Sequence, residues 1–399
     1  MPARRSPSPL KVLISGAGIA GTCPAFWLKR YGFEPTLVER APALRTGGYV
    51  IDFWGAGFEV AERMGLAAQI LQRGYPVREL RQVDRNGARV AGVSLASFER
   101  LLQGRFTSLP RSELAVCLYQ ALPADVVTRF DDGIARLRDD ADALHVDFER
   151  GGLGRFDLVI GADGLHSQVR RLVFGGDARF ERYLHMKVAA FTTGHYRPRE
   201  ELVYLIHRQV GRQVGRFSMR DDRTLLLFVF ADENPSIPAS LEEQKSLLRR
   251  QFGAYGWECP QILAALERQE ELYMDRVSQV HMDSWHRGRV ALLGDAACSV
   301  SLLGGQGCAL AMTAAYVLAG ELQLAGGDHA LAFARYEQRL RGLLAAKQKA
   351  ALRFAAFFAP GSRWSLWLGN VVMKLADVPF LSALAIGGAL QDRLELPRY

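Results

Sequence analysis

The first forty residues contain two apolar runs separated by a glycine-rich break and a helical pattern. The apolar, β-branched run 10–15 predicts a buried parallel strand, and the helical pattern 19–31 follows it until Gly32 ends the helix. A second apolar run, 33–38, predicts the next strand. This order predicts a β-α-β unit at the start of a parallel sheet.

Two later apolar runs resemble the first strand, and each is followed by glycines. Residues 156–160 precede the sequence Gly-Ala-Asp-Gly (161–164), and residues 290–293 precede Gly-Asp-Ala-Ala (294–297). A long apolar helix is predicted after the second of these, at 308–325. Parallel strands of this kind, separated by helices, predict an α/β fold.

The middle of the chain shows short strands with turn signals between them. Residues 203–207, 214–219 and 224–230 are typical of antiparallel strands. A helix is predicted after them, at 241–252. We therefore expect an antiparallel sheet here, with residues alternating between its two faces.

The last part of the chain is helical and increasingly apolar. Residues 330–358 predict a helix with Arg and Lys on one side, and residues 364–390 are rich in apolar side chains interrupted by Lys374, Asp377 and Pro379. One interpretation is a set of helices packed over the binding site. The other is a helix at a membrane surface, which would deliver an apolar substrate. The packed arrangement is preferred.

Composition places the chain among ordinary globular proteins. It has 399 residues, of which 49% are hydrophobic and 23% charged, enough for two or three domains. The net charge of +8 suggests an anionic partner, but the positive charge is scattered and forms no block. We therefore expect no nucleic-acid partner.

The five cysteines are dispersed and lack a CxxC spacing, which argues against a disulfide framework or a zinc site. A reducing cytosol fits this pattern, and a cytoplasmic location is expected. Residues 1–9 lack the apolar core of a secretory signal and are expected to be a disordered leader. No uncharged apolar run of about 18 residues is found, so no transmembrane helix is expected.

The glycines after the first strand have the spacing of a dinucleotide-binding turn. Gly16 permits the tight turn, Gly18 lets the backbone approach a pyrophosphate, and Gly21 lets helix and strand pack closely. The helix N-terminus offers free N–H groups to phosphates. Glu39 closes the second strand, where it can accept hydrogen bonds from a ribose and would repel a 2′-phosphate. FAD or NAD is therefore favoured over NADP at this site.

The second and third glycine motifs each carry one aspartate. Asp163 lies in a setting that is also common in ordinary turns. Asp295 precedes the glycine-rich loop 304–307, which can form a nest of N–H groups for an anion or a flavin carbonyl. We expect Asp295 to bind a ribityl hydroxyl, and the alternative is that it caps the next helix. The order and spacing of the three motifs indicate FAD.

At this point the chain resembles the FAD-dependent monooxygenases of the para-hydroxybenzoate hydroxylase type, nearest to the branch of single-component aromatic hydroxylases and tetracycline-modifying enzymes. Beyond the three motifs, the resemblance rests on the stretches 46–55, 109–114, 277–280 and 285–289. It implies a Rossmann-like FAD-binding domain with a parallel sheet, an inserted antiparallel-sheet substrate domain and a C-terminal helical region. It also implies that no second Rossmann domain binds NAD(P)H.

The expected boundaries follow from this layout. The FAD-binding domain is discontinuous, at 10–171 and 276–345. The substrate-binding sheet occupies 172–275, and the C-terminal helices occupy 346–399.

The resemblance also implies which residues contact the cofactor. Arg40 is expected beside the adenine ribose, Arg111 at the ribityl or phosphate region, and Arg45 with 47–48 on a segment over the flavin. The expected cofactor-binding residues are Gly16, Gly18, Ile19, Ala20, Gly21, Glu39, Arg40, Arg45, Gly48, Arg111, Asp163, Gly294, Asp295, Gly305 and Gly307.

Candidate residues for substrate and catalysis are less sharply indicated. Tyr204, Arg216 and Phe228 are candidates to line the substrate pocket, and the alternative for each is ordinary sheet core or a solvated face. Because the cofactor carries the chemistry, no side-chain nucleophile is required. Arg45 and Asp52 are the catalytic candidates, and no metal site is expected.

One loop departs from the family pattern. Relatives usually carry prolines in the loop after the third motif, where this chain has Val300-Ser301-Leu302. Leucine in place of proline frees φ and restores an N–H donor. Cys298 occupies a position where relatives often carry an aromatic residue or His; a small buried thiol is preferred over a covalent link to the flavin.

The resemblance implies that NADPH or NADH reduces FAD, and that O₂ then forms a flavin C4a-hydroperoxide that hydroxylates an aromatic or polycyclic small molecule. A monomer or homodimer is expected. An epoxidase, a ring-expanding oxygenase or a reductase of the same fold remains open, as does a catalytically impaired FAD-binding accessory protein. Weak membrane association through the C-terminal helices is the alternative to their packing over the site. Halogenation is disfavoured because the W-x-W-x-I-P signature is missing.

Overall fold

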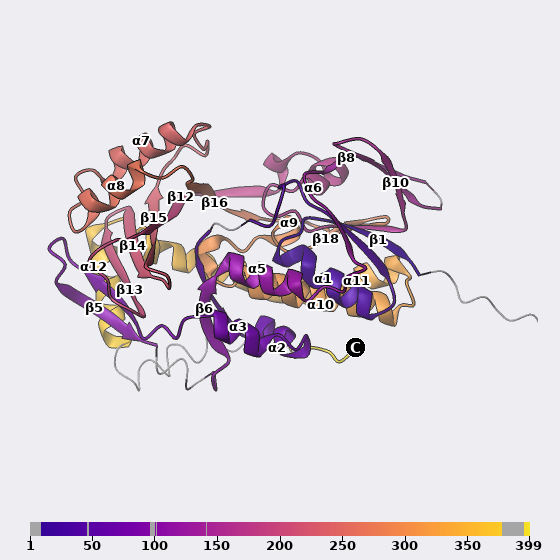
Figure 1. Cartoon of the computed structure of the whole chain (residues 1–399), viewed down its shortest axis with the longest axis horizontal. Coiled ribbons are helices and arrows are strands. Elements are labelled where there is room, and N and C mark those ends of the chain that lie inside the picture. Colours follow the sequence, from indigo (N-terminus) through magenta and orange to yellow (C-terminus); the bar gives the residue numbers. More distant parts are fainter. Residues whose placement is uncertain (1–8, 46–47, 96–99, 101, 141, 377–394) are drawn as a thin grey trace, which may run out of the picture.

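The protein is an elongated α/β molecule in which a parallel sheet with its helices lies at one end and a large, mostly antiparallel sheet at the other (Figure 1). The computed structural model describes residues 9–45, 48–95, 100, 102–140, 142–376 and 395–399. The predicted α/β class is confirmed.

The first sheet has six strands in the order β17-β18-β11-β1-β2-β7, and only the β17–β18 pair is antiparallel. Its strands are β1 (Lys11–Ser15), β2 (Glu34–Val38), β7 (Val127–Arg129), β11 (Leu158–Gly161), β17 (His286–Arg287) and β18 (Val290–Leu292). Val12, Leu13 and Ile14 are fully buried because both faces of the central strand are covered. The strands predicted at 10–15, 33–38, 156–160 and 290–293 are therefore present, with ends shifted by one or two residues.

Helices from distant parts of the sequence pack on this sheet and on one another. They are α1 (Ile19–Arg30), α2 (Ala56–Arg63), α3 (Ala67–Arg73), α5 (Arg111–Gln120), α6 (Gln168–Phe174), α9 (Asp295–Cys298) and α10 (Gly307–Leu324). The rings of Trp27 on α1 and Tyr316 on α10 meet edge to face at 4.8 Å. By length and composition alone α10 would suit a membrane span, but 78% of it is buried inside the protein, as in a core helix.

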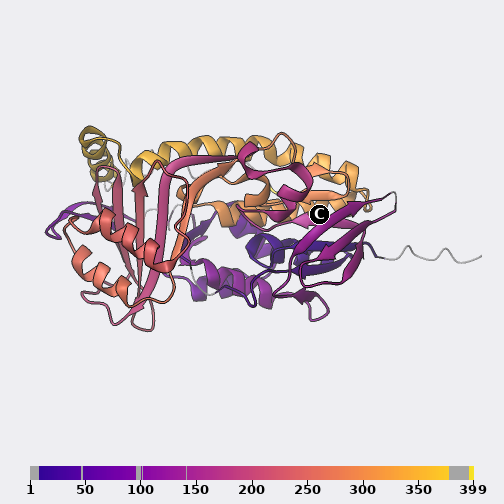
Figure 2. The ribbon, with the colours of Figure 1, turned by 90° about the horizontal axis from the view of Figure 1, so that it is seen from above.

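The second sheet has seven strands in the order β16-β12-β15-β14-β13-β4-β5, and only the β13–β4 pair is parallel. Its strands are β4 (Glu79–Val83), β5 (Arg89–Ser94), β12 (Glu181–Gly194), β13 (Val203–Gln209), β14 (Arg212–Ser218), β15 (Arg223–Ala231) and β16 (Tyr273–Val280). One face packs against α7 (Leu241–Phe252) and α8 (Cys259–Glu267), which lie side by side over it (Figure 2). The other face points toward the first sheet.

Two smaller sheets complete the fold. The antiparallel pair β3 (Val50–Trp54) and β6 (Phe106–Pro110) lies between the two large sheets. A three-stranded sheet formed by β8 (Ile134–Asp139), β9 (Leu144–Phe148) and β10 (Leu153–Phe156) lies at the end of the molecule farthest from the large sheet (Figure 1). Short 3₁₀ turns occur at η1 (Asp177–Arg179) and η2 (Leu302–Gly304). The helix α11 (His329–Phe358) runs along the molecule toward the large sheet, and α12 (Arg363–Ala376) follows it (Figure 2).

Several expected boundaries fall inside elements, and two strands of the large sheet lie outside the segment expected to form it. The large sheet takes β4 and β5 from within 10–171, and β16 crosses the expected boundary at 275/276. The boundary expected at 345/346 falls inside α11, which continues without a break. These differences arise because strand pairing and helix continuity depend on distant partners that a local pattern does not contain. The leader expected at 1–9 lies outside the described residues except for its last position.

The contact between α2 and α10 requires a glycine. A Cβ at Gly57 would overlap the Cα and Cβ of Ala309 on α10, so the two backbones touch there. We predict that Gly57→Ala destabilises the protein by about 1–3 kcal/mol through overpacking. Thermal unfolding followed by circular dichroism measures the effect.

Gly342→Ala is the matched control, because Gly342 is an exposed glycine within α11 whose added Cβ would meet nothing within 4 Å. Alanine is the better helix former, so this variant should be neutral or more stable by about 0.5–1 kcal/mol. Equal unfolding temperatures for the two variants would contradict the close packing of α2 on α10.

Candidate functional site

The three glycine motifs, far apart in the sequence, meet at the same edge of the parallel sheet. A Cβ at Gly16 would lie 2.6 Å from the carbonyl oxygen of Ala162, in the second motif. A Cβ at Gly294, in the third, would lie 3.0 Å from the Cβ of Ala20. The carboxyl ends of parallel strands are where such folds bind ligands, so the predicted motifs form one site.

The N-terminus of α1 is open at this site. Its N-cap residue, Gly18, provides no side-chain hydrogen bond, and no acidic residue lies in the first turn. A Cβ at Gly18 would meet nothing within 4 Å, whereas one at Gly21 would overlap the carbonyl oxygen of Gly16. The first-turn N–H groups of Ile19 and Ala20 therefore border free space at the positive end of a helix, which fits a pyrophosphate.

Glu39 lies at the end of β2 and is fixed by the backbone. Its two carboxylate oxygens accept hydrogen bonds from the N–H groups of Ala17 and Ala41, each at 2.9 Å. Each oxygen keeps a second lone pair, so the carboxylate can still accept from a ribose. Next to it, Arg40 forms an ion pair with Glu149 at a surface hollow of about 350 Å³ that is also lined by Asp131, Asp132 and Arg150. This place fits the adenosine half of a dinucleotide.

Polar and aromatic side chains gather where the β3–β6 pair meets the large sheet. One group interacts electrostatically and consists of Tyr49, Arg111, Tyr273, Asp295 and Cys308. Asp52, three residues after Tyr49, interacts with Tyr204 of the large sheet. Asp52 and Arg111 keep exposed surface. We call these seven residues the central recess.

Arg111 and Asp295 are the charged pair of the central recess. Arg111 begins α5, and its backbone N–H donates to the carbonyl of Tyr49 at 3.1 Å. Burial alone would lower the pKa of the Arg111 guanidinium. Interactions with Cys308, Tyr49 and Asp295 outweigh this effect, so the pKa is raised. Burial raises the pKa of Asp295, and Arg111 partly offsets this. Asp295 is the first residue of α9, after the N-cap Gly294, and its carboxyl interacts with Ser299 at the end of the same short helix.

Asp52 lies on β3 and points into the central recess. Ser108, opposite it on β6, donates a hydrogen bond of 2.5 Å to its Oδ1. Burial raises the pKa of the Asp52 carboxyl, and the bond from Ser108 offsets this only in part. Burial also raises the pKa of Tyr204, with a contribution from Asp52, which shows that the two groups are neighbours. The recess therefore holds an acid that keeps its proton to a higher pH than an exposed aspartate does.

Asp163 is used inside the protein. Its carboxylate accepts from Ser167 Oγ at 2.5 Å and from the backbone N–H groups of Gln168 and Val169 at 2.8 and 3.1 Å. Asp163 therefore fixes the start of α6. This is close to the alternative that the sequence left open, in which Asp163 is an ordinary turn residue. Its place against Gly16 leaves the second motif in contact with the first.

The loop without prolines is fixed by two buried glutamine side chains. Gln279 Nε2 donates to the carbonyl of Val300 at 3.2 Å, and Gln348 Nε2 donates to the carbonyl of Ser299 at 3.0 Å. Gln279 also donates to the backbone of Gln348, so β16 and α11 hold the loop from both sides. Val300 is buried in the core. These hydrogen bonds restrain the loop backbone, as the fixed φ of a proline would do.

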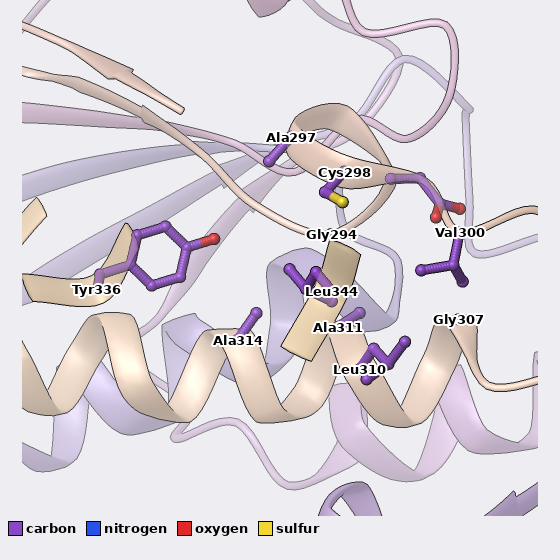
Figure 3. Close-up of a pocket in the computed structure, with 11 residues that line it drawn as sticks. Gly294, Ala297, Cys298, Val300, Gly307, Leu310, Ala311, Ala314, Tyr336 and Leu344 are labelled. Carbon is purple, nitrogen blue, oxygen red and sulfur yellow. The ribbon is translucent and has the colours of Figure 1, made fainter. Parts of the chain in front are cut away.

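Cys298 points into a small cavity (Figure 3). The cavity has a volume of about 10 Å³, enough for a single water and far too small for a flavin. Its lining includes Tyr336 and Leu344 of α11. Burial raises the pKa of the thiol to about 12, so it stays protonated, as expected for a structural cysteine.

The remaining expected cofactor residues lie around the central recess or outside the described part. Added Cβ atoms at Gly48, Gly305 and Gly307 would meet nothing within 4 Å, so each borders open space. Burial raises the pKa of Tyr273, and the charge of the exposed Arg45 offsets a small part of this rise. Residues 46–47 lie outside the described residues.

Two of the three residues expected in the substrate pocket are on the wrong face of the sheet. Phe228 is buried against Phe252 of α7, with ring centroids 4.9 Å apart, and Arg216 pairs with Glu258 at 3.1 Å beside α8. Tyr204 lies on the opposite face, beside Asp52. Arg216 and Leu205 pair across β13 and β14, so Arg216 and Tyr204 belong to opposite faces by alternation.

Sequence reasoning missed Tyr49, Tyr273 and Cys308, which line the central recess. The rings of Tyr49 and Tyr273 lie 5.8 Å apart. Tyr49 and Cys308 each directly follow an expected cofactor glycine, and that adjacency is the signal that would have identified them. Tyr273 carries no comparable signal. Among the described residues, no three His, Cys, Asp or Glu side chains gather as a metal site would require.

The converging motifs, the open helix N-terminus and the central recess define an FAD-dependent oxidoreductase. Residues 9–338 match the family described as FAD binding domain. The chain therefore belongs to the FAD-dependent monooxygenase family of the para-hydroxybenzoate hydroxylase type, which confirms the resemblance seen in the sequence.

Individual relatives agree with this assignment. The chain is 40% identical over 346 residues to an uncharacterized protein of Mycobacterium tuberculosis, covering 84% of this chain and 91% of that protein. It is 32% identical over 391 residues to a flavin-dependent monooxygenase from an unknown prokaryotic organism, covering 98% and 99%. Among solved structures, the tetracycline destructase Tet(55) matches with a TM-score of 0.84 at 31% identity, covering 99% of this chain and all of that one.

The open space at Gly18 can be tested directly. We predict that Gly18→Ala folds normally but binds FAD at least about tenfold more weakly, because the added methyl group occupies the space into which the pyrophosphate fits. Gly18 has φ −77°, which alanine adopts without strain. Titration of the apoprotein with FAD, followed by flavin fluorescence, measures the affinity.

Gly176→Ala is the matched control. Gly176 also precedes a short helix, has φ −60° and would have open space at its Cβ, but it belongs to none of the three glycine motifs. This variant should bind FAD as the unchanged protein does. An unchanged FAD affinity in Gly18→Ala would exclude the α1 N-terminus as the pyrophosphate site.

Proposed function

We propose that this chain is an NAD(P)H- and O₂-dependent flavoprotein monooxygenase that hydroxylates an aromatic or polycyclic small molecule. The monooxygenase class follows from the family. The reductant, the substrate class and the roles of individual residues are the proposal. The observation that carries it is the Asp52 carboxyl, which accepts a hydrogen bond from Ser108 and interacts with Tyr204. Three residues before it, Tyr49 interacts with Arg111 and Asp295.

The walls of the central recess suit a flat, apolar substrate with a polar edge. Tyr204 stacks on Phe217, with ring centroids 5.5 Å apart, and Tyr75 meets Phe217 edge to face at 5.3 Å. Tyr49, Val50 and Tyr273 contact the same apolar cluster. Aromatic walls of this kind favour offset or edge contacts with an aromatic ring.

The cofactor and the residues of this chain have different roles in the proposed reaction. When bound, FAD supplies the redox chemistry, accepting a hydride from NADH or NADPH and activating O₂. The α1 N-terminus and Glu39 would hold its pyrophosphate and ribose, and Arg111 and Asp295 its ribityl region. The proton on Asp52 would be donated to an oxygen of the substrate and so orient the ring.

The similarity to a tetracycline destructase suggests one concrete substrate type. That protein's name states what it acts on, and the match covers 99% of this chain at 31% identity. A tetracycline is polycyclic and carries phenol and enol oxygens, which a protonated Asp52 could bind. We therefore include a tetracycline, along with simpler phenols, among the probes.

The deciding experiment measures the oxidation of NADH and NADPH by the FAD-loaded protein. NADH and NADPH are each tested with a tetracycline and with simple phenols, and products are analysed by mass spectrometry and NMR. The proposal expects a product that has gained one oxygen atom on a ring carbon. Epoxide or ring-expanded products would assign one of the related oxygenations instead. Nicotinamide oxidation that yields no oxygenated product from any probe would contradict the proposal.

The raised pKa of Asp52 predicts a pH dependence. The proton donor is present below that pKa and is lost as the pH rises through it, so kcat/KM should fall on the alkaline side. Asp52→Asn keeps an N–H donor that does not titrate, so it should remove this fall while retaining activity within about tenfold. Asp52→Ala should lower kcat/KM about 10–100-fold at the acidic end.

Asp283→Asn serves as the control for this measurement, because Asp283 is exposed and lies outside the central recess. It should leave the pH profile unchanged. An alkaline fall that persists in Asp52→Asn would assign the titration to another group.

The face assignment of the large sheet is tested by a pair of substitutions. Tyr204→Leu removes a wall of the central recess and should raise KM about tenfold or more, with little change in stability. Phe228→Leu leaves a void under α7 and should cost about 1–3 kcal/mol of stability without changing KM. Substrate kinetics and urea unfolding of both variants separate the two effects. A larger KM change in Phe228→Leu would reverse the assignment of faces.

A further inference from the structure

The helix α12 presents an apolar stripe to the outside of the protein. Its residues recur at helical spacing on one face: Trp364 (74% exposed), Trp367 (52%), Leu368 (56%), Val372 (57%) and Leu375 (50%). The two tryptophan rings stack with centroids 4.7 Å apart. We call these five residues the α12 stripe. Within the described part of the chain, nothing covers it.

The opposite face of α12 is firmly attached to the protein. Met373 is buried, and Asn370 accepts a hydrogen bond of 2.9 Å from Arg208 of β13. Arg208 also donates to the carbonyl of Phe357, at the end of α11. These contacts fix the rotation of α12 about its axis. The outward direction of the stripe is therefore a property of the fold.

The sequence that carries the stripe is rich in positive charge. Residues 338–376 contain seven Lys and Arg and no Asp or Glu, whereas the chain's average composition would place about four acidic residues in a stretch of this length. Two of the seven, Arg339 and Arg341, form ion pairs within the protein. Arg363 and Lys374 are exposed on α12 itself, so the helix that carries the stripe also carries cations.

The stripe belongs to the substrate side of the molecule. Along β13, Tyr204 and Arg208 point to the same face by alternation, and that face also borders the central recess. Phe358, at the end of α11, packs against the same face through Val188 and Val229. Figure 2 shows α12 at the end of α11, protruding beyond the strands of the large sheet.

We propose that α12 and the adjoining end of α11 dock on the surface of an anionic lipid bilayer. The α12 stripe would lie at the boundary between headgroups and acyl chains, where tryptophan is favoured, and the neighbouring Lys and Arg would contact lipid phosphates. A substrate that partitions into lipid would then be held next to the central recess. This docking does not depend on which substrate the recess accepts.

Charge favours a bilayer over a second copy of the chain as the occupant. A symmetric contact between two stripes would bring the same cations of both copies together, and like charges in close contact are unfavourable. An anionic surface instead complements them. Residues 377–394, which follow α12, lie outside the described residues and are treated as a competing occupant in the test.

The test uses the full-length, FAD-loaded protein and vesicles of two compositions, one of phosphatidylcholine alone and one of equal parts phosphatidylcholine and phosphatidylglycerol. Co-sedimentation should show binding to the anionic vesicles at least about tenfold tighter than to the neutral ones, and added salt should weaken it. A blue shift of tryptophan fluorescence should accompany binding. Equal affinity for both vesicles, or no binding to either, would overturn the proposal.

Two variants locate the binding surface. Trp364→Ser combined with Trp367→Ser should weaken binding to the anionic vesicles at least about tenfold. Leu153→Ser is the matched control, since Leu153 is an exposed leucine on β10 at the other end of the molecule, and it should bind as the unchanged protein does. NADPH oxidation measured without lipid should be the same in all three proteins, which shows that the fold and the flavin site are intact.

Two further outcomes would assign the stripe to another occupant and overturn the proposal. One is a concentration-dependent dimer, seen by light scattering, that is lost in the double tryptophan variant. The other is vesicle binding that appears only when 377–394 are replaced by a glycine-serine linker of equal length, which would show that the chain's own segment covers the stripe. Vesicle binding is measured without turnover, so a failure of the proposed oxygenation would leave this result interpretable.

Discussion

The close approach of backbone to backbone at the glycine motifs is the constraint on which the rest of the structure depends. Gly21 lies against the carbonyl of Gly16, Gly16 against that of Ala162, and Gly294 beside Ala20. Side chains at these glycines would separate α1 from β1, and the first motif from the other two. Because the motifs touch, the positive end of α1 faces the same space as Arg111 and Asp295. The site therefore forms only because these positions carry no side chains.

Much of the flavin-binding half could be predicted because its signals are local. The glycine spacing, the apolar run before it and Glu39 after it lie within thirty residues, and each element is present in the structure. The membership of β4 and β5 in the large sheet could not be predicted, because β4 pairs with β13 from far along the chain. The continuity of α11 across the expected boundary is likewise set by packing, which overrides weak local preferences.

The large sheet shows a different limit of prediction from sequence. Alternation along a strand tells which residues share a face, but it does not tell which face meets the flavin. Tyr204 lies on the face that packs with Tyr49 and Val50, whereas Arg216 and Phe228 lie on the other face, under α7 and α8. The loop at Val300 shows a similar limit. The missing prolines were visible in the sequence, but their structural replacement, the amides of Gln279 and Gln348, comes from β16 and α11 and has no local signal.

The contact between Ala20 and Gly294 has a consequence for how the protein is made. About 270 residues separate the two sides of this contact, and at typical ribosomal rates roughly 15–55 s pass between their synthesis. During this interval the β1–α1 unit lacks β18 and α10, so its apolar surface is open and its flavin site incomplete. FAD then stabilises only the finished fold, by mass action. The supply of flavin during growth should therefore govern how much of the newly made protein escapes aggregation and degradation.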